Sequence, residues 1–209
     1  SKFVILMAGS VTPTLRLKNQ IAGARVIAAD GGMKHAETLG LVPELWVGDF
    51  DSTPTALRDQ WSLIEQERFP AAKDKTDGEL AVDAAVKRGA TEIILLGAFG
   101  GQFDHMLAHA ALLHAIAARG IKTFATGGME EAWPLVTSVS LWQIPTGTPI
   151  SVVGMTDLKG LSILGVRWPL QRRDVPFCSP LTISNQAKAD GSISFEQGRA
   201  MVLPYPRQG

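Results

Sequence analysis

The sequence predicts an α/β domain with a mostly parallel sheet flanked by helices, followed by a small all-β, sandwich-like domain. Over about the first 125 residues, short apolar runs alternate with helical patterns, which is the spacing of β-α-β units. Three of these helical patterns stop at a glycine. After Gly127-Gly128 the helical period disappears, and short apolar runs separated by turn residues continue to the end of the sequence.

The elements of the first domain follow from these patterns. The expected strands are residues 3–7, 25–29, 45–47, 68–69, 92–96 and 122–125. The expected helices are residues 33–39, 77–88 and 104–119, which end at Gly40, Gly89 and Gly120. Glycine is the residue that a left-handed helix C-cap prefers. Thr76 and Glu79 have the spacing of a capping box, so the second of these helices should start there.

The second domain is expected to contain strands alone. The expected strands are residues 135–141, 150–154, 161–166, 181–183, 192–195 and 199–203. Gly, Pro, Asn and Asp separate these runs, as in an antiparallel sandwich or barrel. Because the composition changes between Gly127 and Trp133, we place the two domains at residues 1–128 and 129–209.

The composition excludes several classes of protein. With 209 residues and 45% hydrophobic composition, the chain can bury a sizeable core. Twenty basic and twenty acidic residues cancel, so no long-range field attracts nucleic acid or an anionic membrane. No apolar stretch approaches the roughly 18 residues of a membrane span, and residues 3–9 are too short for a signal peptide. The single cysteine, Cys178, is expected to be a buried thiol, and a cytoplasmic location is expected.

The stretch Gly48-Asp49-Phe50-Asp51-Ser52 follows the apolar run 45–47 and carries two carboxylates. In an extended chain, alternate residues share a face, so Asp49 and Asp51 can hold a divalent cation while water and phosphate oxygens complete its octahedral shell. The alternative is a loop in which Asp and Ser cap the next helix, with Pro54 in its first turn. The pattern alone does not decide between these two interpretations.

Two further polar clusters follow predicted strands, where ligands of an open parallel sheet bind. Asp30-Gly31-Gly32 lets the backbone approach a ligand closely, although a tight turn with Asp as a helix cap also fits. The segment 73–77 precedes a helix N-terminus, which favours anions, and Lys73 and Lys75 can bind phosphate. A solvated charge run with a capping box also explains it, and Asp77 is the functional candidate within it.

The fourth cluster is the glycine-rich segment 97–105, which joins a predicted strand to a predicted helix. Such loops bind phosphates because their bare backbone N–H groups can converge on one anion. The alternative is a flexible turn with Asp104 as a helix cap. His105 and His109 are expected to lie on a helix face without a metal, because a spacing of four without a third ligand does not make a zinc site.

In their order and spacing, these motifs resemble the thiamine pyrophosphokinase family. The resemblance rests on Asp-Gly-Gly at 30–32, Gly-Asp-Phe-Asp-Ser at 48–52, Lys-Asp-Lys-Thr-Asp-Gly-Glu-Leu-Ala at 73–81 and Gly-Gly-x-x-Asp-His at 100–105. The second domain adds Gly-Val-Arg-Trp-Pro-Leu at 165–170 and Ser-Asn at 184–185, which are similar to the C-terminal signature of that family. Nearly the whole chain is covered, and the ordered combination is more specific than any single motif.

The resemblance implies the transfer of a diphosphoryl group from ATP to the hydroxyl of thiamine, which gives thiamine diphosphate and AMP. It also implies roles for the matching residues. Asp49, Asp51 and Asp77 would hold Mg²⁺ and, with Asp104, form the catalytic set, and we expect the three metal-binding carboxylates to converge on one cation. ATP would be bound by Asp30, Gly31, Gly32, Lys73, Lys75, Gly97, Gly100, Gly101, Gln102 and Asp104. Any of the aspartates could accept the hydroxyl proton.

In this family the thiamine site lies between the subunits of a homodimer, which makes Ser184 and Asn185 candidates for binding the aminopyrimidine. A hairpin turn is their alternative. Trp168 could attract the thiazolium cation, or it could be a core residue. Gln102 stands where the family often has arginine, which leaves the ATP contacts open. A related diphosphokinase with another hydroxymethyl acceptor, such as a pterin, and a nucleotide sensor without catalysis are the alternative functions.

Overall fold

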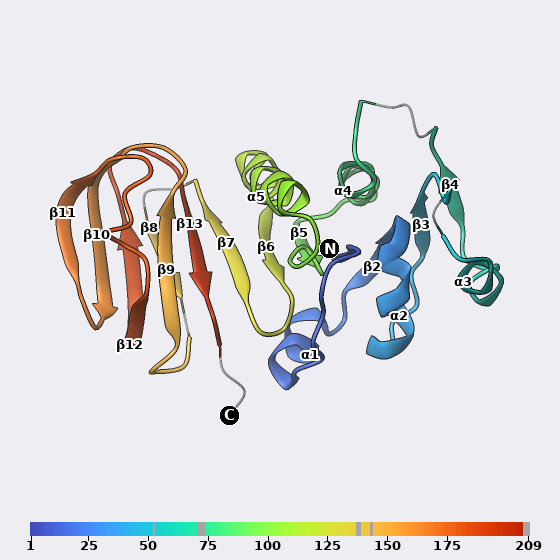
Figure 1. The fold of residues 1–209 in the computed structure, drawn as a ribbon, viewed down its shortest axis with the longest axis horizontal. Helices are drawn as coiled ribbons and strands as arrows, with labels where there is room; N and C mark the ends of the chain where they lie inside the picture. The colour runs from blue at the N-terminus through green and yellow to red at the C-terminus, as the bar shows by residue number, and fades with distance from the viewer. Residues whose placement is uncertain (52, 71–73, 137–138, 143, 207–209) are drawn as a thin grey trace. The chain divides into compact units, whose positions relative to one another are not determined.

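The computed structural model describes residues 1–51, 53–70, 74–136, 139–142 and 144–206. Its contacts divide the chain into two compact units. The first comprises Ser1–Leu112 and Ile121–Gly128, and the second comprises Leu113–Gly120 and Met129–Gly209. Each unit has strands of its own, so each is described by itself below (Figure 1).

The first unit contains a parallel sheet in the order β6-β5-β1-β2-β3-β4. Its strands are β1 (Lys2–Leu6), β2 (Arg25–Ala29), β3 (Leu45–Gly48), β4 (Gln66–Arg68), β5 (Glu92–Leu96) and β6 (Lys122–Thr126). The central strands are buried along most of their length: Phe3 to Leu6 and Ile93 to Leu96 are inaccessible to solvent. Helices on both faces of a parallel sheet produce such continuous apolar strands.

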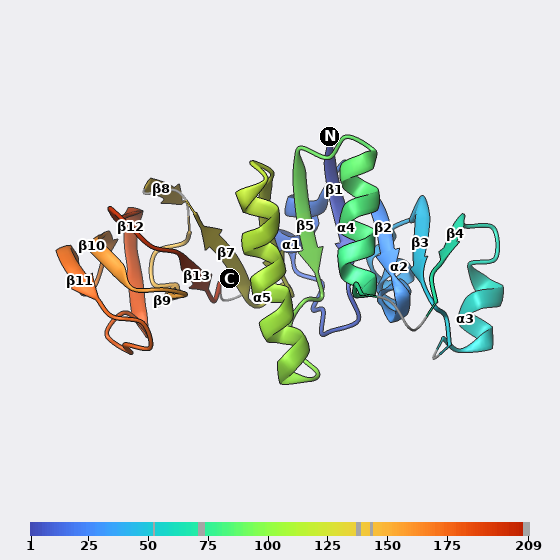
Figure 2. The same ribbon diagram turned by 90° about the horizontal axis from the view of Figure 1, so that it is seen from above.

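Helices connect these strands on the two faces of the sheet (Figures 1 and 2). The helical elements are α1 (Leu15–Ile21), η1 (Asp30–Met33), α2 (Lys34–Leu39), α3 (Thr55–Gln60), α4 (Asp77–Lys87) and α5 (Phe103–Ala118). The glycine stops are confirmed, because Gly40, Gly89 and Gly120 all have positive φ, at 64°, 80° and 76°. Helix α1 was not predicted, and α3 was expected only as the alternative for the segment after Ser52.

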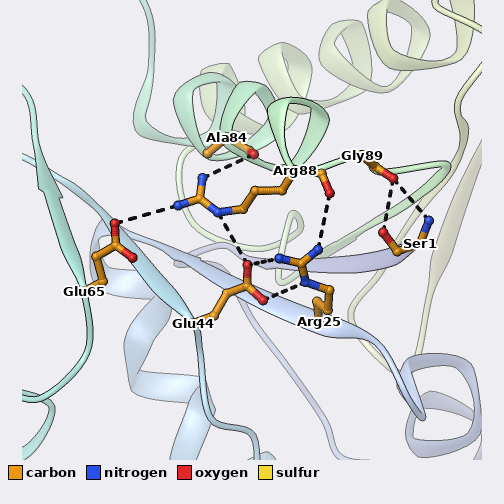
Figure 3. Close-up of polar contacts among 7 residues, drawn as sticks. All are labelled: Ser1, Arg25, Glu44, Glu65, Ala84, Arg88 and Gly89. Carbon is orange, nitrogen blue, oxygen red and sulfur yellow. Dashed lines mark hydrogen bonds and ion pairs between the residues drawn. The ribbon is translucent and has the colours of Figure 1, made fainter.

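An ion-pair network ties the amino ends of these strands to the end of α4 (Figure 3). The guanidinium of Arg25 donates to both carboxylate oxygens of Glu44, at 2.8 and 2.7 Å, and to the carbonyl oxygen of Arg88 at 3.3 Å. Arg88 in turn lies 3.5 Å from Glu44 and 3.9 Å from Glu65. The hydrogen bond with Glu44 raises the pKa of Arg25. The network therefore holds β2, the segment before β3 and the C-terminal end of α4 together.

Replacing the central carboxylate is expected to weaken this junction. Glu44→Gln keeps the shape of the side chain but removes the charge that faces two guanidinium groups, so Tm should fall by about 2–4 °C. Thermal unfolding followed by circular dichroism measures the change, and 0.5 M salt should reduce it. Glu37→Gln, on the exposed side of α2, is the matched control. Equal Tm values for the two variants would contradict a structural role for the network.

The second unit consists mainly of antiparallel strands. They are β7 (Glu131–Leu135), β8 (Val139–Trp142), β9 (Pro149–Gly154), β10 (Leu158–Val166), β11 (Leu170–Val175), β12 (Asn185–Ser194) and β13 (Ala200–Pro204). β7, β13, β9 and the start of β12 pair in one sheet, and β8, the rest of β12, β10 and β11 pair in a second. Buried residues of both sheets, including Val152, Leu161, Ile163 and Val202, form one hydrophobic cluster. The antiparallel β character is therefore as expected.

Several details of the second unit differ from the expectation. Residues 181–183 form no strand, because they lie in turns that precede β12. The run 135–141 is divided between the end of β7 and β8, and β11 was not anticipated. Cys178 is exposed and has a φ of 65°, so the expectation of a buried thiol is wrong. Within the described part of the chain, no helix is long and apolar enough to cross a membrane.

Candidate functional site

The carboxyl ends of the parallel strands lie at one edge of the first unit. Leu6, the last residue of β1, is paired with Ala28 of β2 on one side and with Leu96 of β5 on the other. Leu96 is also paired with Thr126, the last residue of β6. The segments after these strands therefore start from the same edge, which is where open α/β sheets bind ligands. Three of the four clusters that the sequence singles out start there.

The turn after β3 is organised around the buried ring of Phe50. This residue has a φ of 63° and is 1% exposed, and its ring packs edge-on against Trp46 with 4.9 Å between centroids. A bulky residue with positive φ is strained backbone of the kind that concentrates at functional sites. The backbone N–H of Asp51 donates to Oδ1 of Asp49 at 3.0 Å. The chain is therefore turned at Phe50, and the expectation that this stretch is extended is wrong.

Asp30 joins the ends of β2 and β3. Its Oδ1 accepts a hydrogen bond from the hydroxyl of Thr53 at 3.2 Å, and its carbonyl oxygen accepts one from the indole of Trp46 at 2.9 Å. A Cβ atom at Gly48 would lie 3.3 Å from Asp30, so the two loops are close. Asp30 has a φ of 41° and begins η1 without a side-chain cap, which excludes the helix-cap interpretation.

The two glycines that follow Asp30 have different surroundings. A Cβ at Gly32 would overlap the carbonyl oxygen of Leu6 and lie 2.5 Å from its carbon. A Cβ at Gly31 would meet only the side chain of Ala8, at an ordinary 3.6 Å. Gly32 is therefore required for packing against the end of β1, whereas Gly31 is half-buried and can face a ligand.

The start of α4 lies next to the end of β1. The capping box is confirmed: Thr76 Oγ1 accepts from the N–H of Glu79 at 3.2 Å, and Oε2 of Glu79 accepts from the N–H of Thr76 at 2.8 Å. A Cβ at Gly78 would lie 2.5 Å from the terminal methyl of Met7, the residue after β1. Asp77 is therefore in the first helical turn beside this edge.

Lys75, in the same segment, forms an ion pair within the protein. The ammonium of Lys75 lies 2.5 Å from the carboxylate of Asp83, within α4. Lys73 lies outside the described residues, as does Ser52. A phosphate role for Lys75 would require it to leave Asp83.

The glycine-rich loop after β5 uses positive φ at three positions, Gly97, Gly100 and Gly101, with angles of 79°, 75° and 97°. A Cβ atom added at Gly101 would meet no other atom within 4 Å. Gln102 and Asp104 are exposed, and Oδ1 of Asp104 accepts from the N–H of His105. The end of this loop and the first turn of α5 are therefore exposed to solvent.

Two histidines of α5, His105 and His109, contact each other and the loop after β5. His109 lies 2.9 Å from the carbonyl oxygen of Ala98 through its Nδ1, so it ties the helix to the loop. His105 packs edge-on to His109 with 6.3 Å between ring centroids. This agrees with the structural interpretation of the pair.

The segment after β1 is a part of this edge that the sequence analysis missed. Backbone N–H groups of Gly9, Ser10 and Thr12 donate to carbonyl oxygens of the loops after β5 and β6, at 2.8, 2.6 and 2.8 Å. From α2, Lys34 donates to the carbonyl oxygen of Ala8 and His35 contacts that of Gly9 at 2.8 Å. Ala-Gly-Ser directly after an apolar strand was the available signal, by the same rule that selected the other loops.

The donor set of this edge suits magnesium, although it does not form a preassembled cage. Among the described residues, no three His, Cys, Asp or Glu side chains lie close enough to hold a metal ion. The expected convergence of Asp49, Asp51 and Asp77 is therefore not present. Magnesium nonetheless prefers carboxylate oxygens, and it is commonly held by one or two of them together with substrate phosphates. Asp49 and Asp51, half-buried and exposed respectively, fit that mode.

The second unit contains a pocket of about 280 Å³ that brings together all three residues expected to bind the organic substrate. Trp168, Ser184 and Asn185 line it. Its other lining residues are Pro149, Ile150, Ser151, Arg167, Gln186 and Tyr205. The residues come from segments separated by up to 56 positions, so the fold assembles the pocket.

Asn185 holds the backbone of two other residues that line this pocket. Its Oδ1 accepts hydrogen bonds from the backbone N–H groups of Trp168 and Gln186 at 3.1 and 2.9 Å, and its Nδ2 donates to the carbonyl oxygen of Trp168 at 2.8 Å. Ser184 has a φ of 59°, and its N–H donates to Oγ of Ser151 at 3.0 Å. The amide of Asn185 is thus used to hold the backbone, whereas the hydroxyl of the exposed Ser184 is better placed for a ligand.

Trp168 is 55% exposed, so the interpretation as a core tryptophan is wrong. The guanidinium carbon of Arg167 lies 4.7 Å from the centroid of its ring, in cation–π geometry. One face of the indole therefore already carries a cation.

A buried histidine makes stability depend on pH. Burial lowers the pKa of His114 below the ordinary value of 6.5, and the charge of Arg199 lowers it further. Burial also lowers the pKa of His35. Below pH 6.5 the unfolded chain therefore binds more protons than the folded chain, so the free energy of unfolding should fall as the pH is lowered from 7 to 5.

Urea denaturation at several pH values tests this expectation. The variant His114→Leu should show a smaller loss of stability between pH 7 and 5 than the parent, with the remainder attributable to His35 and other groups. Parallel pH curves for parent and variant would show that His114 does not contribute.

The two parts of the chain match two family models. Residues 19–125 match "Thiamin pyrophosphokinase, catalytic domain", and residues 139–200 match "Thiamin pyrophosphokinase, vitamin B1 binding domain". A thiamine pyrophosphokinase of Bacillus subtilis (strain 168) is 27% identical over 196 residues, which cover 85% of each chain.

Solved structures share the fold over the whole chain. The structure of thiamine pyrophosphokinase from Bacillus subtilis has a TM-score of 0.88 at 23% identity and covers 99% of both chains. That of thiamin pyrophosphokinase from Geobacillus thermodenitrificans has a TM-score of 0.85 at 25% identity, covering 100% of this chain and 99% of the other.

Proposed function

The chain belongs to the thiamine pyrophosphokinase family, and from this premise we propose which of its residues carry the reaction. The enzyme transfers a diphosphoryl group from ATP to the hydroxyl of thiamine, which gives thiamine diphosphate and AMP. In this transfer the hydroxyl oxygen bonds to the β-phosphorus, the bond from that phosphorus to the oxygen bridging to the α-phosphate breaks, and the hydroxyl proton is released.

The proposal that ATP binds to the first unit rests on one observation, the shared edge of the parallel sheet. The aspartates after β2 and β3, the first turn of α4 and the glycine-rich loop after β5 all start from it or lie beside it. Phosphoryl transfer requires little covalent help from protein, because positioning and charge compensation dominate its catalysis. Loops held at one sheet edge supply that positioning.

Within this edge we assign Asp49 and Asp51 to Mg²⁺, with Asp77 as a further ligand. When bound, Mg²⁺ would neutralise charge on the phosphate chain. The two aspartates are well suited because the buried ring of Phe50 fixes the turn between them. Asp77 needs a local movement or a bridging water to join them, since no three-carboxylate cluster occurs among the described residues.

The phosphates of ATP are assigned to backbone donors and neighbouring polar groups of the same edge. Positive φ at Gly97, Gly100 and Gly101 turns the loop so that N–H groups can converge on an anion. Asp30 and Gly31 would lie along the nucleotide, and the buried Gly32 would support them by packing against Leu6. Gln102 and Asp104 would add polar contacts at the end of the glycine-rich loop. Lys73 and Lys75 remain candidates for charge compensation, the latter after release from Asp83.

Thiamine is assigned to the pocket of the second unit. Ser184 would donate to or accept from the aminopyrimidine, and Trp168 would offer an aromatic surface. Asn185 acts as a positioning residue, because its amide holds the backbone of Trp168. The match of residues 139–200 to the vitamin B1 binding model supports thiamine over a pterin as acceptor.

We further propose that the enzyme is a cytoplasmic homodimer with thiamine sites between its subunits, as the family resemblance implies. The balanced charge of the chain supports neither nucleic acid nor an anionic membrane as a partner. Light scattering coupled to size-exclusion chromatography gives the oligomeric state, and a monomeric mass at micromolar concentration would count against the dimer.

The function is tested by incubating the purified protein with Mg²⁺, ATP and thiamine. We expect AMP and thiamine diphosphate in equal amounts, measured by anion-exchange chromatography. If ATP is consumed with a hydroxymethyl pterin but not with thiamine, the acceptor is a pterin rather than thiamine. ATP binding without any turnover, persisting in Asp49→Ala and Asp51→Ala, would indicate a nucleotide sensor instead.

A further inference from the structure

The segment Ala8–Thr12, which follows β1, packs against the glycine-rich loop after β5. The N–H of Gly9 donates to the carbonyl oxygen of Gly97 at 2.8 Å, and the N–H of Ser10 donates to that of Phe99 at 2.6 Å. The two backbone segments lie too close together for a side chain between them, because a Cβ at Gly9 would be 2.1 Å from the carbonyl oxygen of Phe99. The conformation of the glycine-rich loop therefore depends on this segment.

Two glycines of the loop are required for this contact. A Cβ at Gly97 would be 2.6 Å from the carbonyl oxygen of Met7, and a Cβ at Gly100 would be 2.3 Å from the hydroxyl oxygen of Ser10. Both positions also have positive φ. Gly97 and Gly100 therefore allow the close approach of the two segments, whereas no such contact restricts Gly101.

Two histidines hold this pair of segments. From α5, Nδ1 of His109 lies 2.9 Å from the carbonyl oxygen of Ala98 in the loop. From α2, Nε2 of His35 lies 2.8 Å from the carbonyl oxygen of Gly9. A carbonyl oxygen can only accept a hydrogen bond, so each of these ring nitrogens must carry a hydrogen. His109 thus holds the loop directly, and His35 holds it through Gly9.

These contacts engage three consecutive carbonyl oxygens of the loop, those of Gly97, Ala98 and Phe99. A carbonyl oxygen is the negative end of a peptide dipole, so it repels a phosphate that approaches it. A loop that binds phosphate must therefore direct its carbonyl oxygens elsewhere and use its N–H groups. In this loop, each of the three carbonyl oxygens is directed toward a donor of the protein.

We infer that His35 and His109 are positioning residues for ATP, which hold the glycine-rich loop in its phosphate-binding conformation. The inference rests on the proposed function, since it takes this loop to bind the phosphates of ATP. Neither histidine lines the pocket that we assign to thiamine. Their loss should therefore affect the binding of ATP and not that of thiamine.

The test measures kcat, the KM values of both substrates and the Kd of α,β-methylene-ATP, which binds like ATP but cannot transfer its diphosphoryl group. His35→Leu and His109→Leu remove the donors, so each should raise the KM for ATP and the Kd of the analogue about fivefold. The KM for thiamine and kcat at saturating ATP should stay within about twofold of the parent values.

Conservative variants test the hydrogen bonds themselves. Gln places an amide N–H near the position of the histidine Nε2, and Asn places one near that of Nδ1. His35→Gln and His109→Asn should therefore restore most of the parent KM for ATP. If these variants bind ATP as weakly as the two leucine variants, the hydrogen bonds are not what positions the loop, and the inference is overturned.

His114→Leu is the matched control, because it makes the same substitution on the same helix. Neither ring nitrogen of His114 has a hydrogen-bond partner among the described residues, so this variant removes no contact of the loop and should leave the KM for ATP unchanged. Thermal unfolding of every variant separates positioning from folding. A purely structural role would lower Tm and the active fraction, and with it kcat, but would leave the KM for ATP unchanged.

A variant of the loop distinguishes failure of the inference from failure of the proposed function. Gly101→Pro cannot keep the φ of 97° and lacks the N–H, so it should weaken binding of the analogue more than about tenfold. If it binds the analogue as tightly as the parent does, the loop does not bind ATP, and the inference falls with that assignment. If Gly101→Pro binds weakly but His35→Leu and His109→Leu keep the parent Kd, the inference alone is overturned.

Discussion

The variant Asp49→Asn is expected to lower kcat at least about 100-fold at saturating ATP and thiamine. The substitution removes the negative charge that we assign to Mg²⁺, but it keeps an oxygen that can accept from the N–H of Asp51, as Oδ1 does in the parent at 3.0 Å. The strained turn at Phe50 should therefore persist. AMP release measured over a range of Mg²⁺ concentrations gives kcat and shows whether more metal is required.

The folded state provides the control for this prediction. Asp49 is only half-buried, so Asp49→Asn should unfold within about 2 °C of the parent. Asp59→Asn removes the same charge from the exposed side of α3 and should leave kcat unchanged. Asp51→Asn should resemble Asp49→Asn. If the Asp49→Asn protein is fully active, Asp49 takes no part in the reaction. If Asp59→Asn also loses activity, the effect comes from the net charge of the protein and not from the site.

The variant Gly32→Ala is expected to destabilise the first unit by about 3 kcal/mol. The new Cβ would overlap the carbonyl oxygen of Leu6 and lie 2.9 Å from the backbone nitrogen of Met7, so backbone rather than a flexible side chain must move. Leu6 ends the central strand, which is inaccessible to solvent and paired on both sides. Urea denaturation measures the change in the free energy of unfolding.

The neighbouring glycine is the matched control for this prediction. At Gly31 a Cβ would meet only Ala8, at 3.6 Å, so Gly31→Ala should change stability by less than about 1 kcal/mol. If Gly31 faces the nucleotide as proposed, the same variant should raise the KM for ATP. Equal stabilities for Gly31→Ala and Gly32→Ala would mean that the loop relaxes without cost and that packing does not require Gly32.

Local signals in the sequence were sufficient for much of the first unit. A capping box at Thr76 and Glu79 and glycine at the helix ends depend on residues within one turn of each other, so they can be recognised without knowing the fold. The buried strands were located from short apolar runs, as at residues 92–96. Helix α1 was not predicted because it has only seven residues, although Thr14 caps it by accepting a hydrogen bond from the N–H of Leu17.

The second unit shows where local signals fail. The run Leu181-Thr182-Ile183 has the composition of a strand, yet Leu181 and Ile183 are about half exposed. Thr182 alone is buried, because its backbone carbonyl and hydroxyl both bond to Val152 of β9. Which residues of this segment face the core was decided by a partner about 30 positions away, and no property of the segment itself specifies that partner.

The sequence by itself determined the family and the segments in which we propose the site, because residue types and their spacing in the motifs are properties of the chain. Only the tertiary structure decided how each side chain is used. Gly32 serves packing, Lys75 pairs with Asp83, and Asn185 holds the backbone of Trp168. It also placed Arg167 on the face of Trp168. The physical reason is that a side chain commits to whichever donor, acceptor or ring the fold brings within reach, and most of these partners are distant in sequence.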